Sequence, residues 1–375
     1  MTAVNSVLIV GGGTSGCALA TLLGRAGVSV EIAEINPDWT ALGSGITLQG
    51  NALRVLDELG VLEEVLASGY AFDELGLRSA SGELLAEVVD ARTGGPDLPA
   101  TLGMERPRLA RILAAAAREA GVKVRLGSTV ASFRQDAAGV DVLFDDGAKG
   151  RYDLLVGADG IRSHVRDLLW NDEEPEPTGL SIWRIRGPRP SSVVRTEMCY
   201  DGPCLIAGYC PTGEDSMYAY LVEPSQDRTG LSGEERVAVV RDLAAAYGGA
   251  WTDIRADISD PDRLHYTAFE SLLVHSPWGR DRTVLIGDAA HACPPTLAQG
   301  AAMCLEDASV LAELLLAADE LNEAVWASFT ARRFERVRTI VAGSLQIAQW
   351  MRERDRRADV PGLIHRIADI VGRPA

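Results

Sequence analysis

The sequence predicts an α/β protein in which a Rossmann-like dinucleotide-binding domain is interleaved with a second, β-sheet domain and followed by C-terminal helices. Three observations support this class. A glycine-rich turn joins a buried strand to a helix near the N-terminus, two later buried strands end in Gly-Ala-Asp and Gly-Asp, and an acidic, proline-rich stretch separates two parts of the chain. In open α/β sheets, ligands bind outside the carboxyl ends of the strands, where these motifs are expected.

The chain length of 375 residues indicates two domains. We place residues 1–175 and 277–345 in the dinucleotide-binding domain and residues 176–276 in the β-sheet domain. Residues 346–375 are assigned to the C-terminal helices.

Composition limits the partners and the compartment. The net charge of −17 argues against nucleic acid or an anionic membrane as a partner. No run reaches the roughly 18 apolar residues of a membrane span, and the N-terminus lacks a basic region and a cleavage site of the kind found in signal peptides. The six cysteines lack zinc-ligand spacing. We therefore expect a cytoplasmic protein with free thiols and no metal site.

The first unit is a strand, a glycine turn, a helix and a second strand, at residues 6–10, 11–16, 17–25 and 28–33. The glycines allow a tight turn and a close approach to a diphosphate, and the acid that ends the second strand can bind ribose hydroxyls. This pattern does not distinguish FAD from NAD. The predicted dinucleotide contacts are Gly11, Gly13, Thr14, Ser15, Gly16 and Glu34.

Residues 43–152 are expected to supply one glycine-hinged loop, 43–49, and several short elements. The elements are helices at 51–59 and 106–120, hairpin strands at 74–78 and 84–88, and strands at 122–125, 129–134 and 140–144. A buried strand at 154–156 follows. It ends near Asp159, and Ser163 can cap the next helix.

Composition changes at residues 171–177, which form the acidic, proline-rich linker. The expected elements of the β-sheet domain are strands at 181–186, 197–200, 204–210, 217–223 and 264–269, and a helix at 233–247. This sheet is expected to lie over the ring of the cofactor and to form one wall of the substrate site.

The chain then returns to the first domain through a buried strand at 284–286. Asp288 follows the strand, and Pro295 delays a helix expected at 301–316. A carboxylate would thus face a helix N-terminus across a tight loop, at the edge where ligands bind. The last helices are expected at 321–356 and 361–371. We interpret Arg332, Arg333, Arg336 and Arg338 as the solvated face of an amphipathic helix.

The motifs together resemble those of FAD-dependent aromatic hydroxylases with the p-hydroxybenzoate hydroxylase fold. The signature GDAAH…P…GQG matches at residues 287–300 and the match extends to Asp307, with Ala298 and Ala302 as departures. The chain also carries a GxGxxG turn and an Asp159-Gly160 motif. The AQGAAM variant is similar to the salicylate, 6-hydroxynicotinate and pyridine-ring hydroxylase branch. An arginine that many relatives carry shortly before residue 43 is missing.

The resemblance implies cofactor contacts and a reaction. Further FAD contacts are implied at Gly45, Ile46, Arg106, Asp159, Asp288, Pro295, Gly300 and Ala301. His291 is expected to be structural rather than a base. The family uses noncovalent FAD, NADH or NADPH as co-substrate, and O2, and it inserts one oxygen atom into a hydroxylated aromatic or N-heteroaromatic ring through a flavin C4a-hydroperoxide.

The substrate site is expected on the β-sheet domain, where a hydrogen-bonding group near the substrate hydroxyl would assist the reaction. Catalytic candidates are Tyr218 and His265, and substrate contacts are expected from Thr47, Gln49, Tyr209, Tyr218 and Tyr220. Residues 199–222 contain no Arg or Lys, so a substrate carboxylate would have to pair with Arg184 or Arg186.

Two alternatives stay open at this point. The first is a flavin epoxidase or dearomatising oxygenase that acts on a larger natural product. The second is an FAD-binding redox sensor without catalytic activity. We expect a monomer or a homodimer that binds a small aromatic substrate.

Overall fold

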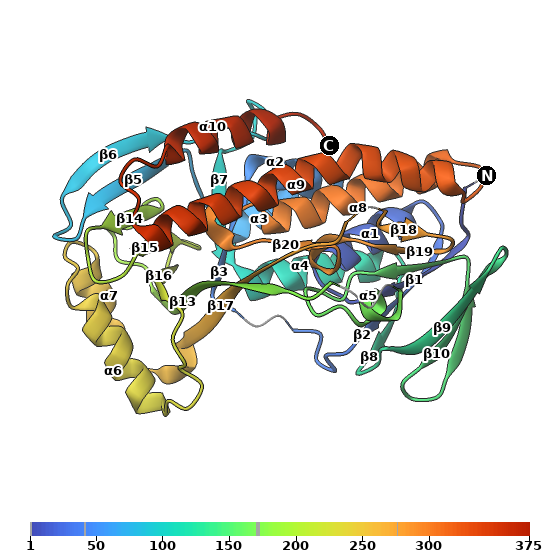
Figure 1. Ribbon diagram of the computed structural model, residues 1–375, viewed down its shortest axis with the longest axis horizontal. Coiled ribbons are helices and arrows are strands. Elements are labelled where there is room, and N and C mark those ends of the chain that lie inside the picture. The colour runs from blue at the N-terminus through green and yellow to red at the C-terminus, as the bar shows by residue number, and fades with distance from the viewer. Residues whose placement is uncertain (1, 41–42, 170–172, 276) are drawn as a thin grey trace.

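The computed structural model describes residues 2–40, 43–169, 173–275 and 277–375. It is an α/β structure in which two large sheets lie next to each other and long helices run along one side (Figure 1). The predicted fold class is confirmed. Two residues of the predicted linker, 171 and 172, lie outside the described residues.

The first sheet has six strands in the order β18-β19-β12-β1-β2-β8, and β1 pairs in parallel with both β2 and β12. This arrangement brings the carboxyl ends of β1, β12 and β19 to one edge. The bounds are β1 Ser6–Val10, β2 Ser29–Glu34, β8 Lys123–Leu126, β12 Leu154–Gly157, β18 Gly279–Arg280 and β19 Thr283–Leu285.

Helices cover this sheet because their apolar faces pack on its buried strands. In Figure 1, α9 runs along the length of the molecule beside α8, and α10 packs on α9. The bounds are α1 Thr14–Arg25, α2 Gly50–Glu58, α3 Leu62–Ser68, α4 Arg106–Glu119, α5 His164–Leu169, α8 Gly300–Ala317, α9 Glu323–Glu353 and α10 Val360–Val371.

The second large sheet has eight strands in the order β20-β17-β13-β16-β15-β14-β5-β6. One face packs on α6 Gly233–Ala244 and α7 Trp251–Asp257 around Trp183 and Trp251. The bounds are β5 Glu74–Ser79, β6 Leu84–Val89, β13 Glu176–Pro188, β14 Glu197–Tyr200, β15 Ile206–Pro211, β16 Ser216–Pro224, β17 Leu264–Leu273 and β20 His291–Ala292.

Two three-stranded sheets complete the fold. One is β3-β7-β4, formed by Gly45–Gln49, Thr101–Glu105 and Tyr70–Phe72, and the other is β11-β10-β9, formed by Lys149–Tyr152, Gly139–Phe144 and Val130–Asp136. Single-turn helices lie at η1 Pro261–Arg263, η2 Gly287–Ala289 and η3 Pro295–Leu297.

Several sequence-based expectations need correction. Most of the expected loop at 43–49 is strand β3, because it pairs along its whole length with β7. The β5–β6 hairpin, placed in the first domain, joins the second sheet through β14. Helix α9 runs unbroken through the boundary drawn at residue 345, and α7 was not anticipated.

Among the described residues, no helix is long and apolar enough to cross a membrane. Within the same residues, no group of three His, Cys, Asp or Glu side chains is placed to hold a metal ion.

Candidate active site

The turn between β1 and α1 leaves an open helix N-terminus. Gly11 has φ +103° and packs against the Ala158 carbonyl, so a side chain there would be both strained and obstructed. No side chain of the described residues caps α1, and none of their atoms lies within 4 Å of a Cβ placed on Gly13. The first amides of α1 therefore face free space, which suits a diphosphate.

Glu34 lies at the end of β2 beside this turn. One carboxylate oxygen accepts from the Gly12 amide at 2.7 Å and the other from the Asn36 amide at 2.7 Å. Trp39, in the following loop, donates from its indole to the Gly12 carbonyl at 2.9 Å. The Arg118 guanidinium lies 4.4 Å from the centre of the Trp39 ring. The carboxylate thus sits where a ribose next to the glycine turn would reach it.

The Gly287–Asp288 turn lies against the start of α1. Gly287 has φ +60°, and a side chain there would collide with the Ser15 hydroxyl. The Asp288 carboxylate is half-buried and receives a weak hydrogen bond from the Cys304 thiol at 3.7 Å. Burial raises the pKa of Asp288. A carboxylate with so few donors is a ready acceptor for ligand hydroxyl groups.

A buried ionic brace holds this turn from behind. The Asp307 carboxylate accepts from the Gly287 amide at 2.8 Å, from Arg333 Nε at 2.7 Å, and lies 2.6 Å from His291 Nε2. Burial opposes ionisation of Asp307, but the charges of His291 and Arg333 prevail and lower its pKa to about 2. His291 is fully buried, a placement in keeping with the structural role expected for it.

The expected solvated arginine face of α9 is wrong for two of its four members. Arg333 is fully buried and Arg336 nearly so, and both pair with Glu306 of α8, Arg333 at 2.8 Å and Arg336 at 2.6 Å. The neighbouring Arg332 and Arg338 remain accessible to solvent. A single-helix pattern could not reveal this, because the neutralising carboxylates come from another helix.

The remaining predicted cofactor residues lie where helices and strands begin. Arg106 begins α4, and its side chain passes 3.2 Å from a Cβ placed on Gly43. Gly45 and Ile46 open β3, while Pro295 starts η3 and Gly300 and Ala301 start α8. Among the described residues, nothing lies within 4 Å of a Cβ placed on Gly300. The Ser44 hydroxyl between them is buried without a hydrogen-bond partner.

Asp159 differs from the other acids because its own helix uses it. Its carboxylate accepts from the Ser163 hydroxyl and from the Val165 amide at 3.1 Å. Burial raises the pKa of Asp159. Ser163 in turn caps α5 by accepting from the Arg166 amide at 3.0 Å, as its position before the helix predicted. Through these bonds Asp159 fixes the loop after β12.

Tyr218 joins the two large parts of the molecule. Its hydroxyl lies 3.2 Å from the Thr47 hydroxyl on β3, and any side chain at Gly45 would collide with its ring. Burial raises the pKa of Tyr218, so its hydroxyl keeps its proton across the working pH range. Tyr218 can therefore orient a substrate by hydrogen bonding, but it does not supply a base near neutral pH.

The other substrate candidates are distributed differently. Tyr220 stacks near Tyr218, with ring centres 5.9 Å apart. Gln49 is tied to the loop before α8, because it donates to the Leu297 carbonyl at 3.2 Å and accepts from Gln299. Tyr209 is corrected: it points to the opposite face of the sheet, where it contacts Glu197 and Trp251. Tyr209 on β15 pairs with Ala219 on β16, next to Tyr218. Because neighbouring side chains along a strand point to opposite faces, Tyr209 cannot share the face of Tyr218.

Two basic groups occupy the face that carries Tyr218. Arg184 pairs across the sheet with Tyr220 on β16 and with His265 on β17. The Arg184 guanidinium donates to the Thr267 hydroxyl at 2.6 Å. Burial, and then the charges of Arg186, Arg184 and Arg236, lower the pKa of His265, which is therefore neutral at pH 7.

Comparison with known proteins identifies the family. A model of the FAD binding domain matches residues 5–344. The aurachin C monooxygenase/isomerase of Stigmatella aurantiaca is 31% identical over 366 residues, covering 93% of each chain. The chain belongs to the FAD-dependent aromatic hydroxylases.

Two further proteins are similar to this chain. The 2-heptyl-3-hydroxy-4(1H)-quinolone synthase of Pseudomonas aeruginosa is 31% identical over 316 residues, covering 82% of this chain and 80% of that one. The crystal structure of Klebsiella pneumoniae HpxO, complexed with FAD and uric acid, has a TM-score of 0.84 at 21% identity and covers 98% of this chain and 96% of that one. At this identity the second likeness shows the fold.

These observations agree with FAD as the cofactor of this family member. Two uncapped helix starts, an accepting carboxylate at Asp288 and an unpartnered hydroxyl at Ser44 offer groups that a dinucleotide could bind. The sequence did not point to Ser44 or Trp39, because neither falls on a motif position. The matched signature includes Asp307, but the sequence does not reveal the residues that contact Asp307 and give it its role.

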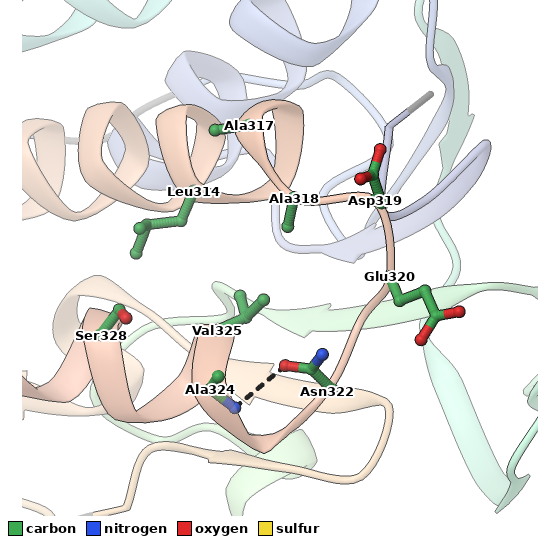
Figure 2. A pocket seen from close by; sticks show the side chains of 9 residues that line it. All are labelled: Leu314, Ala317, Ala318, Asp319, Glu320, Asn322, Ala324, Val325 and Ser328. Atoms are coloured by element: carbon green, nitrogen blue, oxygen red, sulfur yellow. Dashed lines mark hydrogen bonds between the residues drawn. The ribbon is translucent and has the colours of Figure 1, made fainter.

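A separate hollow lies at the corner between α8 and α9 (Figure 2). Its walls come from the end of α8 and the start of α9, including Leu314, Asp319 and Val325. The Asn322 side chain there accepts from the Ala324 amide at 3.0 Å and so caps α9. None of the predicted site residues lines this hollow.

Proposed function

We propose that the enzyme inserts one atom of O2 into a small hydroxylated aromatic or N-heteroaromatic compound, with NADH or NADPH as the reductant. When bound, FAD supplies the redox chemistry, accepting a hydride and activating O2. One observation carries the proposal: the Tyr218 hydroxyl meets Thr47 on β3, so the substrate sheet abuts the strand that borders the cofactor space. The quinolone named for the Pseudomonas aeruginosa relative is also an N-heteroaromatic compound.

The chain's own groups have separable roles in this proposal. Thr47 and Tyr218 orient the substrate hydroxyl, and the Tyr218 oxygen retains its proton. An electron-rich ring is the better nucleophile when its hydroxyl is deprotonated, and the nearby Arg184 cation favours that anion. Glu34 and Asp288 accept hydrogen bonds from the cofactor, and the brace at Asp307 keeps the Gly287–Asp288 turn in position.

A ligand panel tests the proposal directly. The purified protein is mixed with hydroxybenzoates, hydroxypyridines and hydroxyquinolines, and NAD(P)H oxidation and oxygenated product are measured for each. At least one ligand should stimulate oxidation and be converted to product. A yellow protein that fails to oxidise NAD(P)H whichever ligand is added would instead support the redox sensor. An epoxide or a dearomatised product would support the other alternative. The comparisons favour neither alternative.

Cofactor binding is tested separately. Acid precipitation should release all of the flavin, because FAD is held noncovalently. Glu34→Ala removes hydrogen bonds to a charged group, each of which contributes roughly 1.5–3 kcal/mol, so FAD affinity should fall about tenfold or more. Turnover should recover at saturating FAD. An unchanged dissociation constant for FAD would remove Glu34 from the site.

We further propose that the enzyme acts in the cytoplasm as a monomer or a homodimer. Six cysteines with free thiols support a reducing compartment. Size-exclusion chromatography with light scattering would measure the oligomeric state.

A further inference from the structure

Three side-chain amides lie together at the start of α8. Gln49 ends β3, Asn51 lies in the first turn of α2, and Gln299 immediately precedes α8. Asn51 and Gln299 are buried, with exposed fractions of 0% and 1%. They exchange two hydrogen bonds, from Asn51 Nδ2 to Gln299 Oε1 at 3.0 Å and from Gln299 Nε2 to Asn51 Oδ1 at 3.3 Å. Gln299 Nε2 also donates to the amide oxygen of Gln49. We name Gln49, Asn51 and Gln299 the amide clamp.

The amide clamp holds a strained turn. Ala298 stands at the first glycine of the GQG signature and has φ +52° and ψ +29°, the left-handed conformation that a residue with a side chain disfavours. The clamp acts on both neighbours of this residue. Gln49 Nε2 donates to the Leu297 carbonyl at 3.2 Å, and Gln299 follows Ala298 directly. Because a strained residue persists only where its surroundings hold it, these bonds keep the turn in place.

A buried charge network anchors the amide clamp on its other side. Asn51 Nδ2 donates to Glu306 Oε1 at 3.1 Å, and Glu306 is itself held by Arg333 at 2.8 Å and Arg336 at 2.6 Å. Arg336 also donates to the Ile370 carbonyl at 2.6 Å, near the carboxyl end of α10. A continuous series of contacts therefore joins α9 and α10 to the turn before α8, and Asn51 connects its two halves.

The turn determines the direction of the amino end of α8. No side chain of the described residues caps this helix, and none of their atoms lies within 4 Å of a Cβ placed on Gly300. The uncapped amides and the helix dipole favour a ligand that carries negative charge. A flavin gains negative charge when it is reduced. The position of these amides therefore bears on both the affinity for FAD and the ease of its reduction.

We propose that Asn51 is a positioning residue of this enzyme, which acts through Gln299 and Gln49 to fix the turn that directs the first amides of α8 at the cofactor. Both ends of the Gln49 amide are already bonded within the fold, so Gln49 belongs to this clamp and not to the substrate contacts. The inference rests on the proposed function, in which FAD binds at the start of α8.

The test removes the amide groups while keeping the size of the side chains. Asn51→Leu and Gln299→Met are compared with Gln135→Met, a control whose amide makes three hydrogen bonds at the amino end of β19, on the opposite edge of the sheet. FAD titration of the full-length apoprotein measures affinity, and redox titration with a reference dye measures the midpoint potential of the bound flavin.

Both clamp variants should raise the dissociation constant for FAD about fivefold or more, because the lost hydrogen bonds no longer fix the helix start. The midpoint potential should become more negative, because a displaced helix start stabilises the reduced flavin less well. The control should lower the unfolding midpoint and leave both values unchanged. The two clamp substitutions lie on different elements, so one reports if the other misfolds.

The double variant decides whether the two amides act as one unit. If they do, Asn51→Leu combined with Gln299→Met raises the dissociation constant about as much as either change alone. An increase equal to the product of the two single factors would overturn the inference. It is also overturned if both single variants keep the affinity and the potential of the wild type, or if the control shifts them equally.

These measurements need no substrate, so they separate the inference from the proposed function. If no ligand of the panel stimulates NAD(P)H oxidation by the wild type, the proposed function has failed, and the FAD titrations still decide whether Asn51 positions the start of α8.

Discussion

Two groups of arginines have opposite surroundings in this molecule, a buried group on α9 and a half-buried group on the substrate sheet. On α9, Arg333 contacts Glu306 and Asp307, and Arg336 contacts Glu306, so each guanidinium is neutralised within the fold. On the substrate sheet, Arg184 and Arg186 meet a hydroxyl and a carbonyl, and no carboxylate of the described residues pairs with them. The same residue type therefore serves the structure in one place and is left available to a ligand in the other.

The difference follows from what buried charge requires. A buried ion pair is stable only while both partners remain, and it then fixes the elements that carry them. The pairs on α9 tie the last long helix to α8 and, through Asp307, to the turn at Gly287. A half-buried cation without an ion-pair partner contributes less to stability than a paired one, as is common where a site is built for binding.

The largest expected effect on stability comes from removing an arginine of the paired group on α9. Arg333→Ala leaves Asp307 and Glu306 buried without their cation, which should cost about 3–5 kcal/mol of unfolding free energy. Arg338→Ala is the matched control on the same helix, because its partner Glu335 is exposed, and it should change stability little. Denaturant unfolding of both variants measures this. If the two variants lost similar amounts of unfolding free energy, the buried ion pairs of Arg333 would not be special to the structure.

The next effect is a pH dependence of the same brace. The pKa of Asp307 is lowered to about 2 in the folded protein. The ionised carboxylate therefore contributes fully to the free energy of unfolding at a pH above its pKa in the unfolded chain, and this contribution is lost as the pH falls from about 4 to 2. A shift of this size corresponds to about 2 kcal/mol. The stability gap between the wild type and Asp307→Asn should therefore narrow by this amount over that range. A gap that stays constant would show that Asp307 is not held ionised.

A smaller effect on stability, of opposite sign, is expected for the arginines of the substrate sheet. Arg184→Met removes a half-buried cation that has no anionic partner among the described residues, so the FAD-free protein should keep its stability or gain up to about 1 kcal/mol. Substrate-stimulated NAD(P)H oxidation should fall in the same variant. A loss of stability as large as that of Arg333→Ala would mean that Arg184 also serves the structure.

The smallest effect on stability concerns Tyr218, at the junction of the two sheets. Tyr218→Phe keeps the ring against Gly45 and removes the hydroxyl that meets Thr47. Flavin reduction by NAD(P)H should be nearly normal and remain substrate-stimulated. Less oxygenated product and more hydrogen peroxide should form, because small misplacement of the substrate is costly.

Stopped-flow reduction and product yield are measured on the same Tyr218→Phe preparation. Full coupling in the variant would exclude Tyr218 from the substrate site. Equally fast reduction in the absence of any ligand would exclude the expected control of reduction by the substrate.

The sequence could predict the elements because their signals are local. The strand at 6–10, the hairpin turn at Asp146-Gly147 and the helix after Gln299 each follow from a few neighbouring residues, and each is present in the structure. Alternation was harder to use. Tyr209 and Tyr218 lie on neighbouring strands, but their faces depend on register, and register is fixed by pairing between distant segments.

By itself, the sequence determined the fold class, the family and the positions of the cofactor motifs, because glycine turns and strand–helix units are short patterns with local causes. Only the tertiary structure decided which charges are neutralised. Arg333 and Asp307 are 26 residues apart, and Arg184 and His265 are 81 apart, so no local sequence motif contains both members of either pair. Electrostatic pairing depends on distance in space and on burial, and both are products of packing.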